Sequence, residues 1–590
     1  MLALVPMLLL FLVGCQPKST LECTSNVHTL PQPFGAQQAR YDELTRAYLP
    51  PARVVWLSHP ECFGDTQVLL QPGTGQAEVG TRGTCTMTTT AADTASLLLD
   101  FGREMHGGVQ IVINSADDSP VPLRLRFGES VGETFSDCRQ ALNDGYSFND
   151  HAVRDFVIDA ARYGKMEYGS TGFRFLRIDL LAPVTICLKE VNAVMRYRDI
   201  PYIGSFHSSD ARLDSIWMTA AYTVHLNMQE YLWDGIKRDR LIWLGDLHPE
   251  VHTVMAVFGQ HPVVSASIDL ACEQYPQPQW LNGMSSYSMW YLIIHHDWYM
   301  HGGNLAYVKQ HHDYIRGVID HIYDNVDEQG GEDLGGGRFL DWPSSPNSEG
   351  VESGYRALLV WAMRDGAELC RLVGDEQGAQ RCETVIERLS RLVKDHYGLK
   401  QAAALMAIAG LMSAEEASRE CLLSGGPEGF STFYGYYMLE ALAMAGYYDE
   451  AMDIISRYWG GMLDAGATTF WEDFDLAWTA NAGRIDAFTP EGKDNIHGDF
   501  GAYCYPSYRH SLCHGWASGP APWLTRHVLG IEVVEPGCRV LKVEPHLGHL
   551  DWAEGTYPTP QGTVSVRAEK RSDGTVKTTV KAPRGVKVIK

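Results

Sequence analysis

The spacing of apolar residues along this chain constrains its fold more than any single motif does. From about residue 50 to 203, apolar and polar residues alternate. In the stretch VPLRLRFGES, Leu123, Leu125 and Phe127 alternate with arginines, and VQIVIN repeats the pattern. A period of two is typical of strands with one buried face, and Gly and Asp-Ser turns separate these runs. This part of the chain is therefore predicted to be a β-sandwich.

From about residue 205 to 528 the period changes to that of helices. The stretch GYRALLVWAMRDGAELCRLVGD carries an apolar stripe at helical spacing and ends at Gly374, a residue suited to a helix C-cap. Ser413 and Glu416 have the spacing of a capping box at the start of another helix. The region has room for twelve helices at about 27 residues each, loops included. Long loops rich in Gly and Pro interrupt it, and such loops usually carry function.

After about residue 530 the chain returns to strands, with a hairpin predicted at Asp573-Gly574. A chain of 590 residues is too long for one hydrophobic core, so we expect a multidomain protein of α and β type. The predicted parts are a signal peptide at 1–15, a tether at 16–50, a β-sandwich at 51–204, a helical domain at 205–528 and a second β-sandwich at 529–590.

The chain carries 48 basic and 72 acidic residues, which gives a formal net charge of −24. A nucleic-acid surface would need clustered Lys and Arg to neutralise phosphates, so this balance argues against nucleic acid as a partner. A neutral substrate fits the charge better. The 15 Trp and 28 Tyr residues are suited to the faces of sugar rings, but they also simply fill cores.

The N-terminal run MLALVPMLLLFLV is apolar and uncharged. It is shorter than the roughly 20 residues of a membrane-spanning helix and has the length of the apolar part of a secretory signal. LVGC, which ends at Cys15, resembles a bacterial lipobox. This implies lipidation of Cys15 and an exported protein held in the cell envelope by its lipid, and Gln16 favours the outer membrane. The other cysteines form no CxxC motif, so we predict no zinc or redox site and mostly buried thiols.

The stretch WDGIKRDRLIWLGD at 233–246 places three basic residues among three aspartates. It resembles the signature of the bacterial α-L-rhamnosidases, glycoside hydrolase family 78, and agrees best in its second half. Gly235 and Ile236 stand where the family has Cys-Pro, and Asp239 stands where it has its general-acid Glu. AGATTFWEDFD resembles the strip that carries the family's general base, and SLCHGWASGPAPWLTRHVLGI resembles the strip after it.

Other strips extend the resemblance to most of the chain from about 90 to 545. LLLDFGREMHGGVQ, LRFGES and GFRFLRI resemble the family's N-terminal sandwich, and GSFHSSDARLDSIW resembles its entry into the barrel. The resemblance implies an (α/α)6 barrel between β-sandwich domains. It also implies an exo-acting hydrolase that removes terminal α-L-rhamnose, or a related sugar, with inversion and without a cofactor. The expected partner is a carbohydrate, with membrane contact through the lipid anchor alone.

The resemblance implies that Asp239 is the general acid, that Glu472 is the general base and that His514 lines the sugar site. Inversion needs a carboxylic acid to protonate the leaving oxygen and a carboxylate to activate water, roughly 6.5–9.5 Å apart. The arginines beside Asp239 would lower its pKa, whereas burial and nearby carboxylates would raise it. The sequence leaves that balance open, and with it the choice between Asp239 and Asp234 as the acid.

Further substrate-binding residues are predicted in the same strips and in two other segments. Aspartates can accept hydrogen bonds from sugar hydroxyls and tryptophans can offer apolar walls. FLDWPSS supplies such a pair in a long loop, where a turn anchored by a buried Trp is the other interpretation. The predicted residues are Asp234, Arg238, Trp243, Asp246, Trp290, Asp341 and Trp342.

His295, His296 and Asp297 suggest a metal, but consecutive helical residues point about 100° apart and do not converge on one ion, so no metal is predicted.

Two alternative functions stay open. A uronyl hydrolase or a polysaccharide lyase could use the same barrel, and a lyase would form an unsaturated product. A surface glycan-binding protein that has lost catalysis would bind sugar without cleaving it, and the departures at Gly235–Asp239 keep this alternative open.

Overall fold

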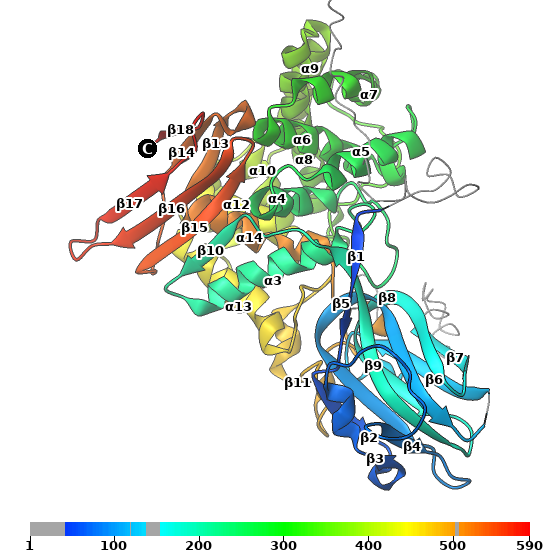
Figure 1. Ribbon diagram of the computed structural model, residues 1–590. Helices are drawn as coiled ribbons and strands as arrows, with labels where there is room; N and C mark the ends of the chain where they lie inside the picture. Colours follow the sequence, from blue (N-terminus) through cyan, green and yellow to red (C-terminus); the bar gives the residue numbers. More distant parts are fainter. Residues whose placement is uncertain (1–41, 119, 137–153, 502–506) are drawn as a thin grey trace, which may run out of the picture. The chain divides into compact units, whose positions relative to one another are not determined.

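The computed structural model describes residues 42–118, 120–136, 154–501 and 507–590, of which Leu44–Lys590 form one compact unit. Cys15 and the predicted signal peptide lie outside the described residues. Strands occupy both ends of the described chain and helices lie between them (Figure 1). The combination of α and β structure predicted from the sequence is therefore confirmed.

The N-terminal strands form one antiparallel sheet with the order β3-β4-β9-β5-β8-β6-β7, in which β1 also pairs with β9 and β2 with β5. The strands are β1 (Leu44–Leu49), β2 (Arg53–Leu57), β3 (Phe63–Gly64), β4 (Cys85–Thr88), β5 (Ser96–Ala116), β6 (Val121–Gly128), β7 (Asp155–Ala160), β8 (Gly164–Leu180) and β9 (Thr185–Arg198). The alternation predicted around Leu123 is confirmed, because Leu123, Leu125 and Phe127 of β6 are all buried.

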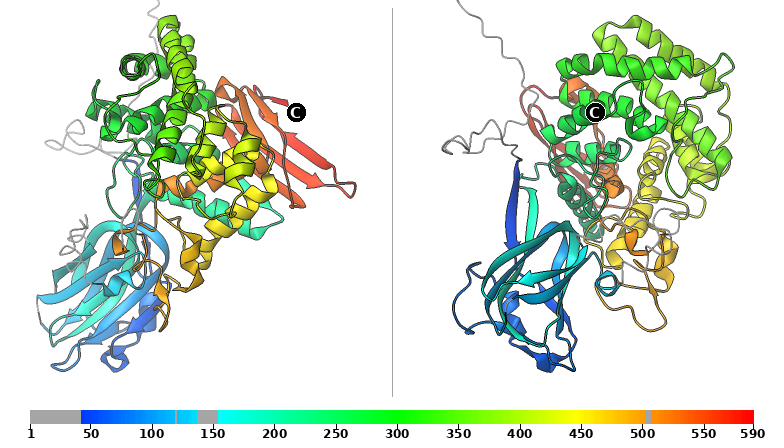
Figure 2. Two further views of the ribbon diagram at one scale, coloured as in Figure 1. Left: turned by 180° about the vertical axis from the view of Figure 1, so that it is seen from behind. Right: turned by 90° about the vertical axis from the view of Figure 1, so that its right-hand side faces the viewer.

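The predicted tether at 16–50 is too long. Leu44–Leu49 pairs along its whole length with Ala193–Arg198 of β9 and so belongs to the sheet. The long strands β5 and β8 bend where their register shifts, and these strands curl in Figure 2. Gly107 lies at such a shift with φ 149°, and a Cβ there would stand 1.9 Å from the Val194 carbonyl oxygen. Only glycine allows β5 to come this close to β9.

Twelve α-helical segments occur among the described residues of the middle region, the number predicted. They are α3 (Ala211–Asn227), α4 (Leu247–Val257), α5 (Pro262–Gln274), α6 (Ser285–Gly302), α7 (Leu305–Asp324), α8 (Ser348–Val373), α9 (Glu376–Ser390), α10 (Lys400–Ile408), α11 (Ala414–Ala417), α12 (Gly435–Met444), α13 (Tyr448–Asp464) and α14 (Pro520–Trp523). Gly374 caps α8 with φ 85°, and the Ser413 side chain accepts a hydrogen bond from the Glu416 backbone, as predicted. Among the described helices, none combines the length and the apolar character needed to cross a membrane.

The C-terminal strands form two small sheets, one with the order β10-β15-β16-β17 and one with the order β13-β14-β18. The strands are β10 (Ser205–Ser208), β13 (Ile531–Glu535), β14 (Val540–Val543), β15 (Trp552–Thr559), β16 (Gly562–Lys570), β17 (Val576–Lys581) and β18 (Lys587–Ile589), and a further short pair joins β11 (Ala482–Gly483) to β12 (Asp494–Asn495). The predicted hairpin at Asp573-Gly574 joins β16 to β17. Strand β10 corrects the predicted start of the helical domain, since Ser205–Ser208 pairs with β15 (Figure 1).

Two apolar cores position the candidate site. One joins the helices to the C-terminal sheets, and the other fills the N-terminal sheet. The second core also contains Leu226, Ile236 and Cys513, which come from outside the sheet. Ile236 belongs to the WDGIKRDRLIWLGD segment, so this segment is anchored in the N-terminal sheet while α3 and α4 flank it in sequence.

Candidate active site

The loop between α3 and α4 holds Asp239 in an unusual backbone conformation. Asp239 and Arg240 both have φ 54°, and the Arg240 N–H donates to the Arg238 carbonyl oxygen at 2.7 Å. A hydrogen bond from residue i+2 to residue i around a residue with positive φ is a strained turn. Two successive non-glycine residues in this region are rare, and strain of this kind clusters at functional sites. The turn leaves the Asp239 side chain partly exposed, at 15%.

Arg238 joins the two predicted catalytic carboxyl groups. One of its terminal nitrogens, Nη2, donates to both carboxylate oxygens of Glu472, 234 residues away in sequence. The other, Nη1, lies 3.3 Å from Asp239 Oδ2. The Arg238 Nε–H donates to the Arg509 carbonyl oxygen at 3.0 Å, which fixes the plane of the guanidinium. Because a guanidinium is only a few ångström across, Asp239 and Glu472 lie close to each other in one site.

Glu472 is held by contacts from several segments. Its backbone N–H donates to the Ser511 carbonyl oxygen at 3.0 Å, and Thr432 and Trp516 donate to its carbonyl oxygen. Its carboxylate also accepts the Ser511 backbone N–H at 3.1 Å. Burial raises the pKa of Glu472, but Arg238, together with His514 and His510, outweighs burial and holds the pKa at about 2. Glu472 is therefore an ionised and firmly held carboxylate.

Asp246 and His514 form a second buried pair beside this one. His514 Nε2 lies 3.0 Å from Asp246 Oδ2, and the Tyr287 hydroxyl donates to Asp246 Oδ1 at 2.9 Å. Burial opposes protonation of His514, but Asp246 and Glu472 reverse the effect and raise the pKa of His514. A Cβ on Gly235 would stand 3.1 Å from His514 Nδ1 and 3.0 Å from the Cys513 carbonyl oxygen. The absence of a side chain at Gly235 thus allows close contact with the His514 strip.

Asp234 lies under the same loop and is almost fully buried. Its Oδ1 accepts the Leu241 backbone N–H at 2.9 Å, and its carbonyl oxygen accepts the Gly515 N–H at 2.8 Å. Burial raises the pKa of its carboxyl well above the ordinary value, and nearby Asp246 and Asp239 add to this. A general acid must be protonated and must reach the substrate. The raised pKa of Asp234 favours its protonated form, whereas Asp239 has the more accessible side chain.

Sequence reasoning missed a buried cluster of charges around Lys237. The Lys237 ammonium lies 3.1 Å from Glu129 Oε2 and 2.9 Å from Glu133 Oε1, and it donates to the His510 carbonyl oxygen at 2.9 Å. Glu129 also accepts the Leu512 backbone N–H at 2.8 Å. These glutamates follow β6, so the N-terminal sheet fixes both the loop of Asp239 and the strip of His514. The LRFGES motif, which contains Glu129, is the one part of this cluster that the sequence analysis had singled out.

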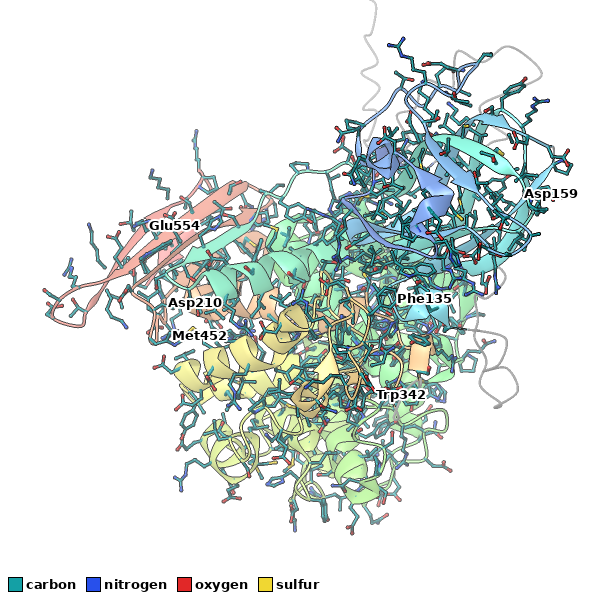
Figure 3. The ribbon with its side chains drawn as sticks, turned by 90° about the horizontal axis from the view of Figure 1, so that it is seen from below. Phe135, Asp159, Asp210, Trp342, Met452 and Glu554 are labelled. Atoms are coloured by element: carbon teal, nitrogen blue, oxygen red, sulfur yellow. The ribbon has the colours of Figure 1, made fainter. Side chains whose placement is uncertain are left out.

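The aromatic and loop residues predicted to bind substrate have different surroundings. Trp243 is half-buried and packs edge-on against Tyr287, the residue that holds Asp246, so it lies at the site. Asp341 is buried and accepts hydrogen bonds from Ser431 and Gln401, which makes it an anchor for its loop. Its neighbour Trp342 is half-buried and packs against Phe339. Figure 3 shows Trp342 among the loops of the helical region.

The prediction that Trp290 contacts substrate is wrong. Its side chain has no exposed surface and is stacked on Tyr437 at 4.9 Å between ring centres, with His248 at the same distance. A Trp in a helical run fills a core as readily as it lines a site, and the sequence pattern did not separate the two. Eight of the nine cysteines in the described part of the chain are buried, as predicted, and all nine are free thiols.

Comparisons with known proteins agree with this architecture. The bacterial alpha-L-rhamnosidase 6 hairpin glycosidase domain matches residues 201–418, and the bacterial alpha-L-rhamnosidase C-terminal domain matches residues 530–589. An alpha-L-rhamnosidase of Alteromonas sp. (strain LOR) is 23% identical over 531 residues, which are 81% of this chain and 54% of that protein. The chain thus spans about half the length of this curated relative.

Solved structures show the same fold. The GH78 family rhamnosidase of Bacillus sp. GL1 has a TM-score of 0.72 and 22% identity, over 88% of this chain and 54% of that one. A rhamnosidase from Klebsiella oxytoca with rhamnose bound has a TM-score of 0.61 and 21% identity, over 82% of this chain and 96% of that one. Identities this low establish similarity of fold, and the chemistry must be argued from the site itself.

Proposed function

We propose that this chain, a divergent member of the bacterial α-L-rhamnosidase family, glycoside hydrolase family 78, is an exo-acting hydrolase that removes terminal α-L-rhamnose, or a related sugar, with inversion. The observation that carries the proposal is the Arg238 guanidinium, which contacts both Asp239 and Glu472. Two carboxyl groups from distant parts of the chain therefore meet in one site, as hydrolysis of a glycosidic bond requires.

Glu472 is proposed as the general base that takes a proton from the attacking water. Its low pKa, about 2, keeps it ionised, but a carboxylate bound through both oxygens is a weak base. Arg238 therefore has to move off one oxygen when substrate and water enter. Hydrogen bonds in a substrate-free site commonly rearrange in the complex, so the present geometry is compatible with this role.

Asp239 is proposed as the general acid, because it is the more accessible of the two candidate aspartates. Its strained turn directs it beside Arg238 and therefore toward Glu472. Asp234 is the alternative, supported by its raised pKa. Asp246 and His514 form a charged pair that is proposed to bind sugar hydroxyls, with Trp243 as an apolar wall next to them.

The finer architecture and the location are also proposals. The twelve helical segments are proposed to form the (α/α)6 barrel of the family, with the flanking strands as β-sandwich domains, supported by the matches to the family's hairpin and C-terminal domains. The LVGC motif supports a lipid on Cys15 and a place in the bacterial envelope, with the outer membrane favoured.

Release of p-nitrophenol from a panel of aryl glycosides tests the proposed activity. We expect turnover of the α-L-rhamnoside at least a hundredfold faster than that of the other sugars in the panel. A purified protein that binds rhamnose in calorimetry but releases no p-nitrophenol would contradict hydrolysis. A product that absorbs in the ultraviolet from a uronate-containing polysaccharide would indicate a lyase instead.

A further inference from the structure

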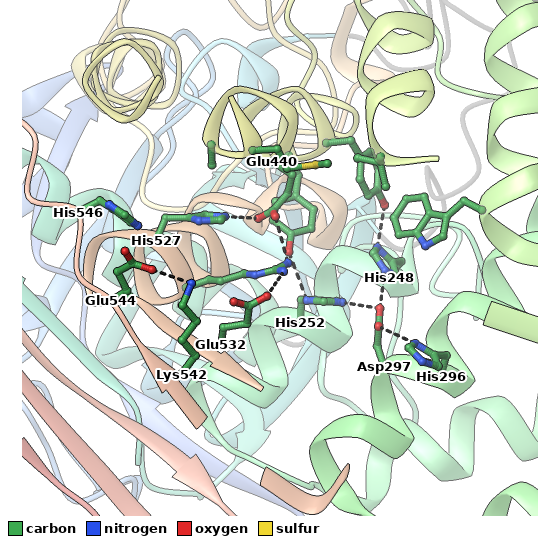
Figure 4. A pocket seen from close by; sticks show the side chains of 18 of the residues that line it. His248, His252, His296, Asp297, Glu440, His527, Glu532, Lys542, Glu544 and His546 are labelled. Atoms are coloured by element: carbon green, nitrogen blue, oxygen red, sulfur yellow. Dashed lines mark hydrogen bonds and ion pairs between the residues drawn. The ribbon is translucent and has the colours of Figure 1, made fainter. Parts of the chain in front are cut away.

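A cavity of ≈ 640 Å³ lies between several helices and the C-terminal strands, lined by residues that the proposed hydrolase does not use. His248 and His252 of α4 and Asp297 of α6 meet in its wall (Figure 4). One ligand atom from each of these three side chains lies within 4.8 Å of the other two. No motif in the sequence connects α4 with Asp297. His295 and His296, the neighbours of Asp297 in sequence, are not part of this group.

Two of the three separations among the donor atoms are close to those of metal ligands, and all three atoms lie within 4.8 Å of one another. His248 and His252 are four residues apart on α4 and so share a face of the helix. Their Nε2 atoms lie 3.1 Å and 2.9 Å from the same oxygen, Asp297 Oδ2. Zinc bonds to His and Asp of about 2.0–2.2 Å place tetrahedral ligand atoms about 3.3 Å apart. An ion could therefore enter between these atoms with only small shifts of the side chains.

A second layer of contacts orients each of the three side chains. The remaining ring nitrogens of the histidines, both Nδ1, lie 2.9 Å from the Tyr437 hydroxyl and 3.2 Å from the Tyr436 hydroxyl. Asp297 Oδ1 faces His296 Nδ1 at 3.5 Å. Histidines that bind metals almost always engage their other nitrogen in this way, which fixes the ring and the tautomer.

The arginines and the lysine that line the cavity are each paired with a carboxylate, and so is His296, the neighbour of Asp297. Arg526 pairs with Glu440 and Arg364 with Asp365. Lys542 pairs with Glu544 (Figure 4), and His296 Nε2 lies 2.9 Å from Glu368 Oε2. The other group of possible ligands among the described residues, which is built on Glu129 and Glu133, differs in this respect. There the Lys237 ammonium already lies between the carboxylates and takes the place that an ion would need.

We infer that His248, His252 and Asp297 form a binding site for one divalent transition-metal ion, with a fourth coordination position open to the cavity. Two imidazoles and one carboxylate suit Zn²⁺, and the same donor set also takes Co²⁺. The site shares no residue with the proposed catalytic groups. Its presence and the proposed hydrolase activity can therefore be tested separately.

The test uses the full chain without a histidine tag, treated with a chelator and then titrated with Co²⁺ and Zn²⁺. We expect one Co²⁺ per chain, the intense visible absorption of four-coordinate cobalt, and its replacement by Zn²⁺. Thermal denaturation should show a rise in Tm on addition of Zn²⁺, because an ion that binds only the folded state stabilises it. A folded protein that takes up neither ion would overturn the inference.

Variants locate the ion. Asp297→Asn and His252→Gln should each raise the Kd for Co²⁺ at least a hundredfold. Tyr436→Phe, which changes only the second layer, should raise it by about tenfold or more. The matched control is His546→Gln, because His546 lines the same cavity but is stacked on Tyr448, away from the three proposed ligands. The Kd of this variant for Co²⁺ should stay within threefold of the wild-type value. Uptake that is unchanged in Asp297→Asn and Tyr436→Phe would place the ion elsewhere, on the cysteines for example, and would also overturn the inference.

Discussion

The Arg238 guanidinium donates to both carboxylate oxygens of Glu472, and both side chains are buried. Removing one partner of a buried pair leaves the other charge without compensation. This relationship is central to the account, because it brings the loop after α3 and the strip after α13 into one site. It also lowers the pKa of Glu472 and so favours the ionised carboxylate.

Glu472→Gln should lower kcat by several orders of magnitude, because the amide cannot take a proton from water. The amide oxygen can still accept a hydrogen bond from Arg238, so the fold should persist. Steady-state kinetics with an aryl α-L-rhamnoside and circular dichroism check both expectations. Asp475→Asn is the matched control in the same acidic strip, where the side chain accepts the Ala477 backbone N–H, and it should keep its activity. Unchanged turnover in Glu472→Gln would remove it as the base.

The stability of the Glu472 pair should depend on pH in a defined direction. The pKa of Glu472 is about 2, below its ordinary value of 4.5, so its contribution to the free energy of unfolding is full above pH 4.5. That contribution is lost as the pH falls toward 2, because the unfolded chain then binds a proton that the folded chain does not. The difference in stability between wild type and Glu472→Gln should therefore shrink on acidification. Urea unfolding at about pH 6 and about pH 3.5 measures it, and a constant difference would contradict the assigned pKa.

Asp239→Asn and Asp234→Asn separate the two candidate acids. The loss of a general acid costs roughly 10²–10⁴ in rate, and the cost is largest when the leaving group is a poor one. We expect Asp239→Asn to lose far more activity on an alkyl rhamnoside than on a dinitrophenyl rhamnoside. Asp234→Asn should affect both substrates alike, because Asp234 supports the loop through Leu241. The opposite pattern would make Asp234 the acid.

Lys237→Met tests whether the N-terminal sheet positions the site. The variant leaves Glu129 and Glu133 without their shared cation, which should cost about 3–5 kcal/mol of stability. Arg457→Met breaks an exposed ion pair with Asp453 and should cost about 0–1 kcal/mol. We also expect kcat of Lys237→Met to fall at least tenfold, since Arg238 and Asp239 follow directly in the chain. A variant with wild-type kcat would show that the cluster serves stability alone.

Much of the fold could be predicted from local patterns. The alternation in β6, the cap at Gly374 and the hairpin at Asp573-Gly574 are all set by neighbouring residues, and all were found. The strands β1 and β10 were not found, because both are short and depend on partners far away in sequence. Strand β10, for example, pairs with β15, and the whole helical region lies between them in sequence.

The site was predictable only where a motif marked it. Resemblance singled out Asp239 and Glu472, but nothing in the sequence shows that Arg238 joins them. Lys237 and Glu129 look like ordinary surface charges in the sequence, yet both are buried. The prediction for Trp290 was wrong because an aromatic ring can be covered by sugar or by protein, and the sequence does not show which. Burial of charge and of aromatic rings is decided by contacts over long distances in sequence.

The anomeric form of the first product tests the central claim most directly. If Asp239 and Glu472 act on opposite faces of the sugar in one displacement, proton NMR during the first minutes of hydrolysis of an α-L-rhamnoside should show β-L-rhamnose ahead of the α form. Mutarotation should produce the α form only later. Initial release of α-L-rhamnose would mean a covalent intermediate and would contradict the roles assigned to these two residues.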